Sequence, residues 1–490
     1  MPFLQGSFIF FMLVFLLIGF SSVLVRRKES TDYLLAGRSL PPSLAGLSAV
    51  ATNNSGYMFI GVIGYTYSAG LAAIWLMIGW IIGDFLISLV VHRRLRRATG
   101  TSDSLTYPTL LGNWFGQNQV GVRVVAALIA VVFLGIYAAA QFSAGSKALN
   151  VLFGWQQGLG AIIGATMVLF YCFSGGLRAS VWTDAAQSSV MLLGMGMMVW
   201  ITVTEQGGIQ PSWEALDAVS ATYMNWFPTD LAFGWLGPLL FVVGWLFAGF
   251  GVIGQPQIMV RFMSLDSEES MRRARFYYYG WFTAFYSLAM LVGLMSRLLL
   301  PELADFDVQE DTELALPVMA AELLPGILAG LVLAGLFAAT ISTADSLILT
   351  CSAAISRDLL PRRWHSYATT RVATLVVIVL ALLIALYSNE TVFWLVLHAW
   401  SGLGAAFAPL LLVYTLGRCP PQWLVIAMVV TGPAVVLLYQ LLDPRIVSTI
   451  YEILPGMVAG GLVYLAGATV VRLRRGPGAL KPERSNDDTA

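Results

Sequence analysis

The residues Leu47-Ser-Ala-Val-Ala-Thr-Asn-Asn-Ser-Gly-Tyr-Met-Phe-Ile-Gly61 place two adjacent amides, several hydroxyls and a glycine inside an otherwise apolar segment. Unpaired polar groups at membrane depth are costly, so irregular backbone is tolerated there only where it faces protein or a water-filled cavity. We therefore expect Ala51 to Gly56 to be the unwound middle of a discontinuous helix. The alternative is a continuous helix whose Thr52, Asn53 and Asn54 bond to neighbouring helices.

Composition places this segment in a membrane protein. The 490 residues are 58% hydrophobic and 11% charged, with a mean hydropathy of +0.77, which is outside the range of soluble domains. The formal net charge is zero, so nothing points to nucleic acid. The sequence shows no nucleophile and base pair, phosphate loop or metal-ligand cluster, and we therefore expect no enzyme.

Apolar stretches near 18 residues or longer recur along the chain, and each predicts a membrane span. There are thirteen of them, at roughly 6–25, 44–65, 71–92, 122–149, 158–177, 184–204, 233–260, 274–300, 326–354, 371–388, 392–416, 422–441 and 451–471. Residues 1–475 are thus expected to form one all-α transmembrane domain. The polar tail 476–490 is expected to be disordered and cytoplasmic.

Alternate connections carry almost all of the basic residues, including Arg26, Arg93, Arg261 and Arg272. Positively charged loops stay in the cytoplasm, so this alternation sets the topology. With an odd number of spans, the N-terminus lies outside and the C-terminus inside a bacterial-type inner (plasma) membrane. The opposite loops are acidic, notably Glu205 to Asp230 and Glu302 to Glu313, and their sign supports the same register.

A second interrupted helix is expected about five spans after the first, because many transporters consist of two inverted repeats with corresponding broken helices. Span seven contains Gly244-Trp-Leu-Phe-Ala-Gly-Phe-Gly-Val-Ile-Gly-Gln-Pro256, in which glycines and a proline weaken a regular helix. Glycines also mark tight helix contacts in membranes, so close packing is the alternative interpretation.

Span nine presents hydroxyls on one helical face, because Ala339, Ser342, Thr343 and Ser346 are spaced three and four residues apart. Such oxygens suit a hard cation such as Na+. They could instead bond only to carbonyls of their own helix.

Ionisable residues at membrane depth are functional candidates by default. They are Asp84, Lys147, Asp184 and Asp345. We expect a second ion site or an ion path at Asp184, Asp345 and Ser346. Asp184 lies where span six is predicted to begin, so it could instead be only interfacial.

Several motifs along the chain together resemble the sodium:solute symporter family, and most closely its proline-transporting members. These motifs are Asp32-Tyr-Leu-Leu-Ala-Gly-Arg-Ser-Leu40, Ser55-Gly56, Tyr171 to Gly176 with Trp182-Thr-Asp184, Gly254 to Met263, Ser342-Thr343, Ala399 to Pro409 and Tyr451 to Gly456. The resemblance implies a LeuT-like core in which residues 44–204 and 233–416 form a five-plus-five inverted repeat.

The resemblance also implies sodium-driven uptake by alternating access. A sodium site would be formed by the Ala51 and Asn54 carbonyls, the Ala339 carbonyl, and the Ser342 and Thr343 hydroxyls. By the same resemblance the solute would lie near the two broken helices. The residues implied there are Asn53, Ser55, Gly56, Tyr137, Ala248, Val252 and Gln255.

Two departures from the proline-transporting pattern bear on what is bound. The proline transporters carry an aspartate where this chain has Asn53. On span seven, the tryptophan and tyrosine that line the pocket of the proline transporters are replaced by Ala248 and Val252. The solute cavity of this chain is therefore either larger, or the lost ring volume is occupied by Phe247, Phe250 or Tyr137.

We expect a sodium-coupled symporter that imports a small organic solute, namely an amino acid such as proline. Its partners would be that solute, Na+ and the lipid bilayer, with no nucleic acid and no obligatory protein partner. The alternatives are a proton-coupled transporter of another solute and a transporter-like solute sensor.

Overall fold

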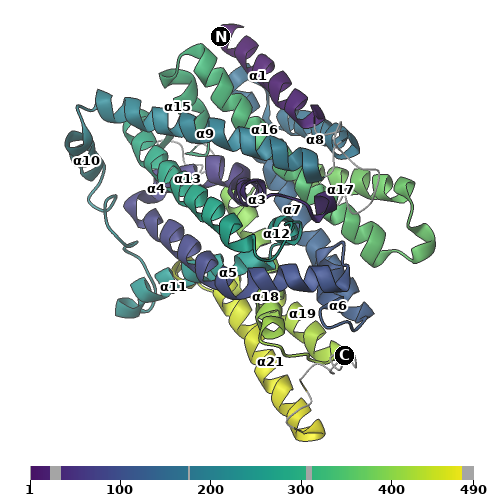
Figure 1. The fold of residues 1–490 in the computed structure, drawn as a ribbon. Helices are drawn as coiled ribbons and strands as arrows, with labels where there is room; N and C mark the ends of the chain where they lie inside the picture. Colours follow the sequence, from purple (N-terminus) through teal and green to yellow (C-terminus); the bar gives the residue numbers. More distant parts are fainter. Residues whose placement is uncertain (1, 22–34, 175–176, 305–311, 477–479, 481–490) are drawn as a thin grey trace.

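The computed structural model describes residues 2–21, 35–174, 177–304, 312–476 and 480 (Figure 1). These residues form helices, and their only β-type pairing is an isolated bridge between Leu40 and Leu265. The all-helical class predicted from hydropathy is confirmed. The motif segments at 22–34 and 175–176 lie outside the described residues.

The helices of the first half begin and end close to the predicted apolar stretches. They are α1 (Pro2–Ser21), α3 (Pro42–Gly56), α4 (Ile63–Ala69), α5 (Ile74–Ser102), α6 (Tyr107–Asn113), α7 (Val120–Phe153), α8 (Gln157–Ser174) and α9 (Leu177–Glu205). A π-helical turn, η3 (Tyr57–Val62), joins α3 to α4, and a 3-10 turn, η4 (Gly70–Ala73), joins α4 to α5.

The second half follows the same pattern. Its helices are α10 (Ile209–Asp217), α11 (Gly237–Phe250), α12 (Pro256–Met263), α13 (Met271–Leu299), α15 (Ala315–Leu323), α16 (Gly326–Ala353), α17 (Tyr367–Tyr387), α18 (Val392–Thr415), α19 (Gln422–Tyr439), α20 (Pro444–Thr449) and α21 (Ile453–Arg475). A 3-10 turn, η6 (Gly251–Gly254), follows α11, and a π-helical turn, η8 (Ala354–Leu359), follows α16.

Each predicted stretch coincides with helix, but the number of membrane crossings stays a prediction. Within the described parts of the chain, ten segments are long and apolar enough to span a bilayer, with Pro42–Ser102 counted as one of them. Two shorter apolar helices, Phe3–Ile18 and Gly158–Phe170, add to these. The predicted number of thirteen is reached if Pro42–Ser102 is counted as two spans and both short helices are included.

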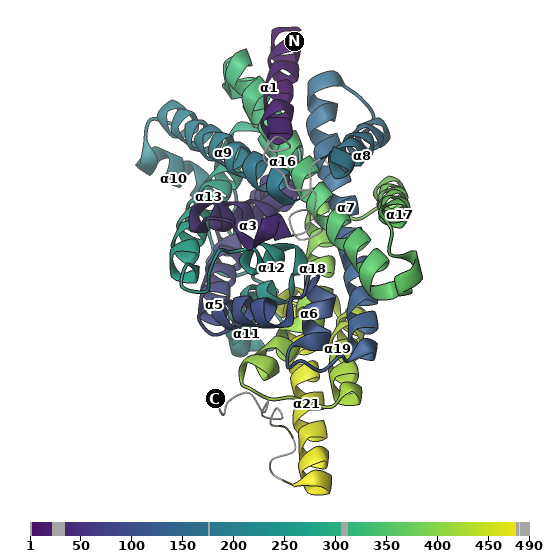
Figure 2. The ribbon, with the colours of Figure 1, turned by 45° about the vertical axis from the view of Figure 1, so that its right-hand side comes forward.

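The helices α16 and α18 form the centre of the molecule, and α1, α17 and α21 lie at its periphery (Figures 1 and 2). α16 packs against α1, α3, α7 and α9, whereas α18 packs against α7, α19, α21 and η6. The peripheral helices expose large apolar side chains such as Leu13, Leu380 and Leu462. Outward-facing leucines are the expected contact surface for lipid, and they support the membrane assignment.

The first predicted break is present but shorter than expected. Residues 51–54 remain in α3, and the helix is interrupted at Ser55, whose φ is 44° and ψ is −166°. Gly56 then returns to helical angles and enters the π-helical turn η3. A Cβ on Gly56 would lie 2.7 Å from the Ala144 Cβ and 2.8 Å from the Thr340 Cγ2, so this position needs glycine because other helices approach closely.

The second predicted break is also present, and both interpretations of its glycines are correct. The chain leaves α11 through η6, adopts an extended conformation at Gln255 (φ −96°, ψ 101°) and re-enters helix at Pro256. Proline is suited to this first helical position, because its missing N–H would have no partner there. A Cβ on Gly249 would lie 2.2 Å from the Trp80 carbonyl oxygen, so this glycine serves close packing of α11 on α5.

Three charged residues occupy positions that the sequence patterns did not predict. Arg261, assigned to a cytoplasmic connection, is buried on α12. Glu313, assigned to an acidic loop, is buried and pairs with Lys147 at 2.6 Å. Asp184 lies about two turns inside α9, which begins at Leu177, and its side chain is also buried.

The predicted disorder of the tail is not tested, since only Gly476 and Leu480 of residues 476–490 are described. Leu480 is buried against Ala468 and Val471. Its carbonyl accepts a hydrogen bond from the Cys419 N–H at 2.8 Å.

Candidate ion and solute site

The Asp184 carboxylate accepts hydroxyl hydrogen bonds from two other helices. Ser342 on α16 donates to Oδ1 and Ser48 on α3 donates to Oδ2, each at 2.6 Å. Asp184 itself comes from α9, so one carboxylate joins three helices beside the first break. Short bonds from O–H to a carboxylate are charge-assisted and hold both partners in fixed orientations.

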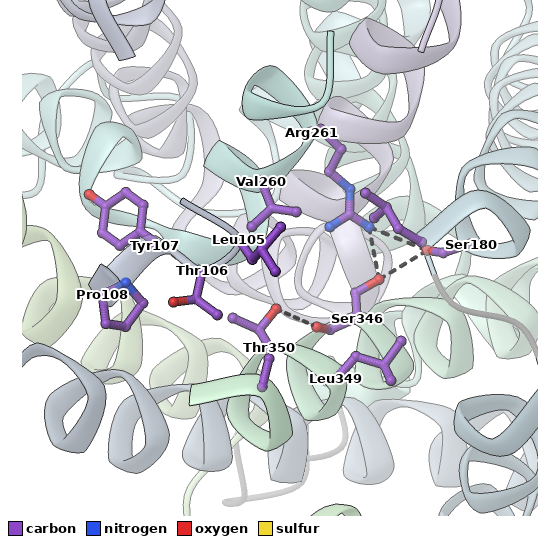
Figure 3. Close-up of a pocket in the computed structure, with 12 residues that line it drawn as sticks. Leu105, Thr106, Tyr107, Pro108, Ser180, Val260, Arg261, Ser346, Leu349 and Thr350 are labelled. Carbon is purple, nitrogen blue, oxygen red and sulfur yellow. Dashed lines mark hydrogen bonds between the residues drawn. The ribbon is translucent and has the colours of Figure 1, made fainter. Parts of the chain in front are cut away.

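Arg261 completes this network from the second broken helix. Its Nη2 donates to Ser346 Oγ at 2.8 Å and to Ser180 Oγ at 3.3 Å, and it lies 3.6 Å from Asp184 Oδ2. Its Nε donates to Ser48 Oγ at 3.2 Å. Figure 3 shows the guanidinium directed at Ser180 and Ser346. A buried, hydrogen-bonded ion pair is therefore shared by α3, α9, α12 and α16.

Sequence reasoning missed Arg261 as a site residue. Its position in the Gly254 to Met263 motif, just after the second break, was the available signal. The residue was counted among the loop arginines because the predicted span ended at residue 260, whereas α12 continues to Met263.

A cavity adjoins Arg261. It is bounded by Ser180, Arg261 and Ser346 on one side and by the segment Leu105–Pro108 on the other (Figure 3). Thr350 and Ala353 of α16 also line it. A mostly apolar cavity therefore adjoins Arg261 and Ser346, and both of these residues belong to the Asp184 network.

Of the five expected sodium ligands, Ala51 and Asn54 lie on α3 just before the first break, and Ala339, Ser342 and Thr343 lie on α16. Ser342 is already oriented by Asp184. Thr343 is buried, and Ala51 and Ala339 are partly buried. The Asn54 carbonyl accepts the Tyr57 N–H, while the Asn54 side-chain amide has no hydrogen-bond partner among the described residues. Carbonyl and hydroxyl oxygens are the ligands that a hard cation prefers, so these residues fit Na+.

The residues proposed for a second ion do not all meet. Asp184 and Ser346 both contact Arg261. The backbone carbonyl of Asp345 accepts a long contact from the Cys172 Sγ at 4.0 Å, and its carboxylate is an electrostatic neighbour of Asp184 and Arg261 without a hydrogen bond to either. Its Oδ1 is buried without a partner among the described residues. Hydrogen bonds and the ion pair therefore join Asp184 and Ser346 through Arg261, whereas Asp345 lies nearby without sharing those bonds.

Asn53 is fixed by a buried chain of hydrogen bonds. Its Nδ2 donates to the Tyr278 hydroxyl at 2.7 Å, and that hydroxyl donates to Asp84 Oδ2 at 2.8 Å. Tyr279 donates to the other Asp84 oxygen at 2.9 Å. The alternative expectation of hydrogen bonds to a neighbouring helix thus holds for Asn53. For Thr52 and Asn54, no side-chain partner exists among the described residues.

The break itself is held by side chains from α7. The Gly56 N–H donates to Gln141 Oε1 at 2.9 Å, and Ser55 Oγ lies 3.1 Å from the Tyr137 hydroxyl. Ser55 Oγ also accepts the Tyr57 N–H at 3.2 Å. The structure therefore brings together three of the expected solute residues, Ser55, Gly56 and Tyr137.

The remaining expected solute residues surround a tryptophan that sequence reasoning did not name. The Trp400 indole N–H donates to the Ala248 carbonyl at 2.9 Å, and Gln255 Nε2 donates to the Trp400 carbonyl at 3.0 Å. Ala248 and Val252 are fully buried. The aromatic ring beside Ala248 is thus that of Trp400 on α18, in addition to the rings of Phe247, Phe250 and Tyr137 that we considered.

Two interrupted helices beside a central hydroxyl-bearing helix define an inverted-repeat secondary transporter, in which ions and solute bind where the helices break. Comparison with protein families identifies the class further. Residues 33–416 match the sodium:solute symporter family, and the chain belongs to that family.

Curated relatives match along almost the whole chain. A sodium/proline symporter of Staphylococcus aureus (strain JH9) is 31% identical over 486 residues, which cover 96% of this chain and 92% of the relative. The osmoregulated proline transporter OpuE of Bacillus subtilis is 28% identical over 461 residues, covering 92% and 91%. These relatives are transporters, and the protein is a secondary transporter rather than an enzyme.

Solved structures show the same fold at lower identity. A Na+-coupled sialic acid symporter in a substrate-bound outward-open state superposes with a TM-score of 0.75 and 18% identity, covering 96% of this chain and 98% of that one. MhsT in complex with L-phenylalanine superposes with a TM-score of 0.56 and 15% identity, covering 86% and 98%. The LeuT-like architecture is confirmed.

Proposed function

We propose that this chain imports a small amino acid, proline in the first instance, together with Na+. The observation that supports this proposal most is the hydroxyl of Ser342, which is held by Asp184 next to the break at Ser55. The names of the curated relatives supply the solute class.

The proposed sodium site uses the Ala51, Asn54 and Ala339 carbonyls with the Ser342 and Thr343 hydroxyls. A hydroxyl has one hydrogen and two lone pairs. Because Ser342 gives its hydrogen to Asp184, its lone pairs remain available to a cation. Asp184 thus orients a ligand and adds a nearby negative charge that favours cation entry.

The proposed exit path passes Asp184 and Ser346 toward the cavity bounded by Arg261. A departing Na+ leaves a carboxylate that needs another positive partner, and Arg261 is 3.6 Å away. Exchange of Na+ for Arg261 at Asp184 would keep the buried charge compensated at each step. Asp345, with its unpartnered oxygen, is the residue that favours the second candidate, coupling to protons.

One sodium ion is sufficient to drive uptake. A charge that crosses 100 mV releases about 2.3 kcal/mol, which corresponds to roughly fiftyfold accumulation of solute before the sodium gradient is added. We propose that this happens in the plasma membrane of a bacterial cell, with the N-terminus outside and the C-terminus in the cytoplasm. The distribution of basic residues supports that orientation.

Uptake by purified protein in liposomes tests the proposal. Labelled proline and a panel of other amino acids are offered with and without an inward sodium gradient. We expect proline uptake that requires Na+ and persists when the pH gradient is collapsed.

Each alternative gives a different result in this assay. Uptake that ignores Na+ but stops when the pH gradient is collapsed would establish proton coupling. Solute binding without uptake would favour a sensor.

A further inference from the structure

Four tyrosine side chains approach one another directly beyond the first break. Tyr57 is the second residue after Ser55, and its hydroxyl is an electrostatic neighbour of the hydroxyls of Tyr137, Tyr286 and Tyr451. They come from η3, α7, α13 and the residues just before α21. We refer to Tyr57, Tyr137, Tyr286 and Tyr451 as the tyrosine cluster.

Two members of this cluster have hydrogen-bond partners outside it. The Tyr137 hydroxyl pairs with Ser55 Oγ at 3.1 Å, and the Tyr451 hydroxyl donates to the Leu397 carbonyl at 2.7 Å. The hydroxyls of Tyr57 and Tyr286 face each other and meet no other hydrogen-bond partner among the described residues, although these residues are only 2% and 1% exposed. Two phenols that have only each other can use one of their two hydroxyl hydrogens, so at least one buried donor is left for another molecule.

Aromatic rings form the adjoining wall. The Tyr57 ring stacks on Phe393 with centroids 5.7 Å apart and lies 5.6 Å from the ring of Trp80. Trp80 in turn lies 4.7 Å from Trp400, which is bonded to the Ala248 carbonyl. The buried indole N–H of Trp80 also lacks a hydrogen-bond partner among the described residues. Apolar walls that carry a few polar groups are typical of small-molecule sites.

The chemistry of these unsatisfied groups selects the ligand. A phenol can donate one hydrogen, and an indole N–H can only donate. The nearest buried basic residues are committed elsewhere, since Lys147 pairs with Glu313 and Arg261 pairs with Asp184. Neutral hydrogen-bond donors can bind a carboxylate, but they do not neutralise its negative charge. With no free basic residue nearby, the site suits a zwitterion, whose ammonium group balances the charge of its own carboxylate.

We propose that the Tyr57 and Tyr286 hydroxyls bind the carboxylate of the transported amino acid, with the Trp80 N–H as a third donor. The proposal deepens the function proposed above and rests on it. It places the solute beyond Ser55, beside Tyr137, whereas Ser48 and the Asp184–Arg261 pair lie on the opposite side of the break. Ion and solute therefore share the interrupted backbone without sharing side-chain ligands.

The test removes single oxygen atoms. Tyr57→Phe, Tyr286→Phe and the double variant keep the rings and delete the proposed donors. Tyr65→Phe is the matched control, because Tyr65 stacks on the same Phe393 ring at 4.4 Å but is not part of the tyrosine cluster. Each variant is reconstituted, and competition by proline and by prolinamide, which lacks the carboxylate, is measured against labelled proline.

We expect each single variant to raise the KM for proline about tenfold or more, because each loses a charge-assisted hydrogen bond. The preference for proline over prolinamide should fall in parallel, and Tyr65→Phe should behave as wild type. Binding of ²²Na⁺ without solute, measured by equilibrium dialysis, should be unchanged in all variants.

Three outcomes separate this inference from the function on which it rests. If the wild-type protein takes up no amino acid with Na+, both the proposed function and this inference are wrong. Wild-type uptake of proline with an unchanged KM and preference in the double variant would overturn the inference alone. Loss of ²²Na⁺ binding in step with loss of proline uptake would also overturn it, because the hydroxyls would then support the ion site or the fold.

Discussion

The two helix breaks beside the ion site are maintained by different forces. At the first, Ser55 adopts a backbone conformation that is rare for any residue but glycine. The backbone groups released there are bonded by side chains, notably by Gln141 from α7. At the second, two glycines precede the extended Gln255 and Pro256 begins the next helix. Local sequence is enough to interrupt that helix.

This difference indicates how each break serves transport. A break held by distant side chains can respond when those side chains move, so the first break is suited to sense ion and solute. A break set by glycine and proline keeps its shape, so the second is suited to hold α12, and with it Arg261, at a fixed place. The predictions below test this division.

The largest effect is expected at Arg261. Arg261→Ala removes the guanidinium that α12 places beside Asp184, and it leaves the Asp184 carboxylate buried without an ion pair. Losing one member of a buried pair costs about 3–5 kcal/mol. Thermal unfolding in detergent should shift strongly downward and uptake should be lost, whereas Arg272→Ala, at an exposed position on α13, should change neither.

A double variant separates charge from shape at this pair. Asp184→Asn with Arg261→Gln removes both charges, so it should recover part of the thermal stability without recovering transport. If Arg261→Ala alone unfolds at the wild-type temperature, the pair does not anchor α12.

A smaller effect, on ion affinity, is expected where α16 meets the first break. Ser342→Ala and Thr343→Ala should each raise the sodium concentration for half-maximal uptake by about tenfold or more, equivalent to about 1.4 kcal/mol. Ser352→Ala is the control, because that hydroxyl donates to the Ile348 carbonyl of its own helix and accepts from Thr374 on α17, whereas the assigned site lies between α16 and α3. Unchanged sodium dependence in both site variants, at equal amounts of reconstituted protein, would contradict the assigned site.

The two breaks can be compared through their glutamines. Gln141→Leu leaves the buried Gly56 N–H without an acceptor, at a cost of about 1–3 kcal/mol. Gln255→Leu removes a bond to the Trp400 carbonyl, but the backbone there is still set by glycine and proline. Chemical denaturation should therefore show the greater loss for Gln141→Leu. Equal losses would mean that both breaks depend on side-chain support.

The smallest effect is expected at Ser55. Ser55→Gly relieves the positive φ but forfeits the contact with Tyr137, and the two changes should nearly cancel, within about 1 kcal/mol. Gly56→Ala is the informative contrast, because its Cβ would approach Ala144 and Thr340 within 3 Å. It should destabilise by about 1–3 kcal/mol on the same denaturation assay.

The sequence by itself determined the class of protein, the helices and the positions of both breaks. These features depend on local composition, since lipid excludes unpaired polar groups and glycine and proline weaken helices wherever they occur. The hydroxyl face of α16 was equally readable, because helical spacing fixes which residues neighbour each other.

The tertiary structure alone decided which polar groups became partners. Ser48 and Asp184 are 136 positions apart, and Asn53 and Tyr278 are 225 positions apart. Nothing local distinguishes the buried Arg261 from an arginine in a cytoplasmic loop, or the buried Glu313 from an acid in an exposed one. Burying a charge is costly unless a partner from another helix pairs with it, so only the packed helices show which charges are buried. The same packing decides which buried hydroxyls beyond Ser55 remain available to bind a ligand.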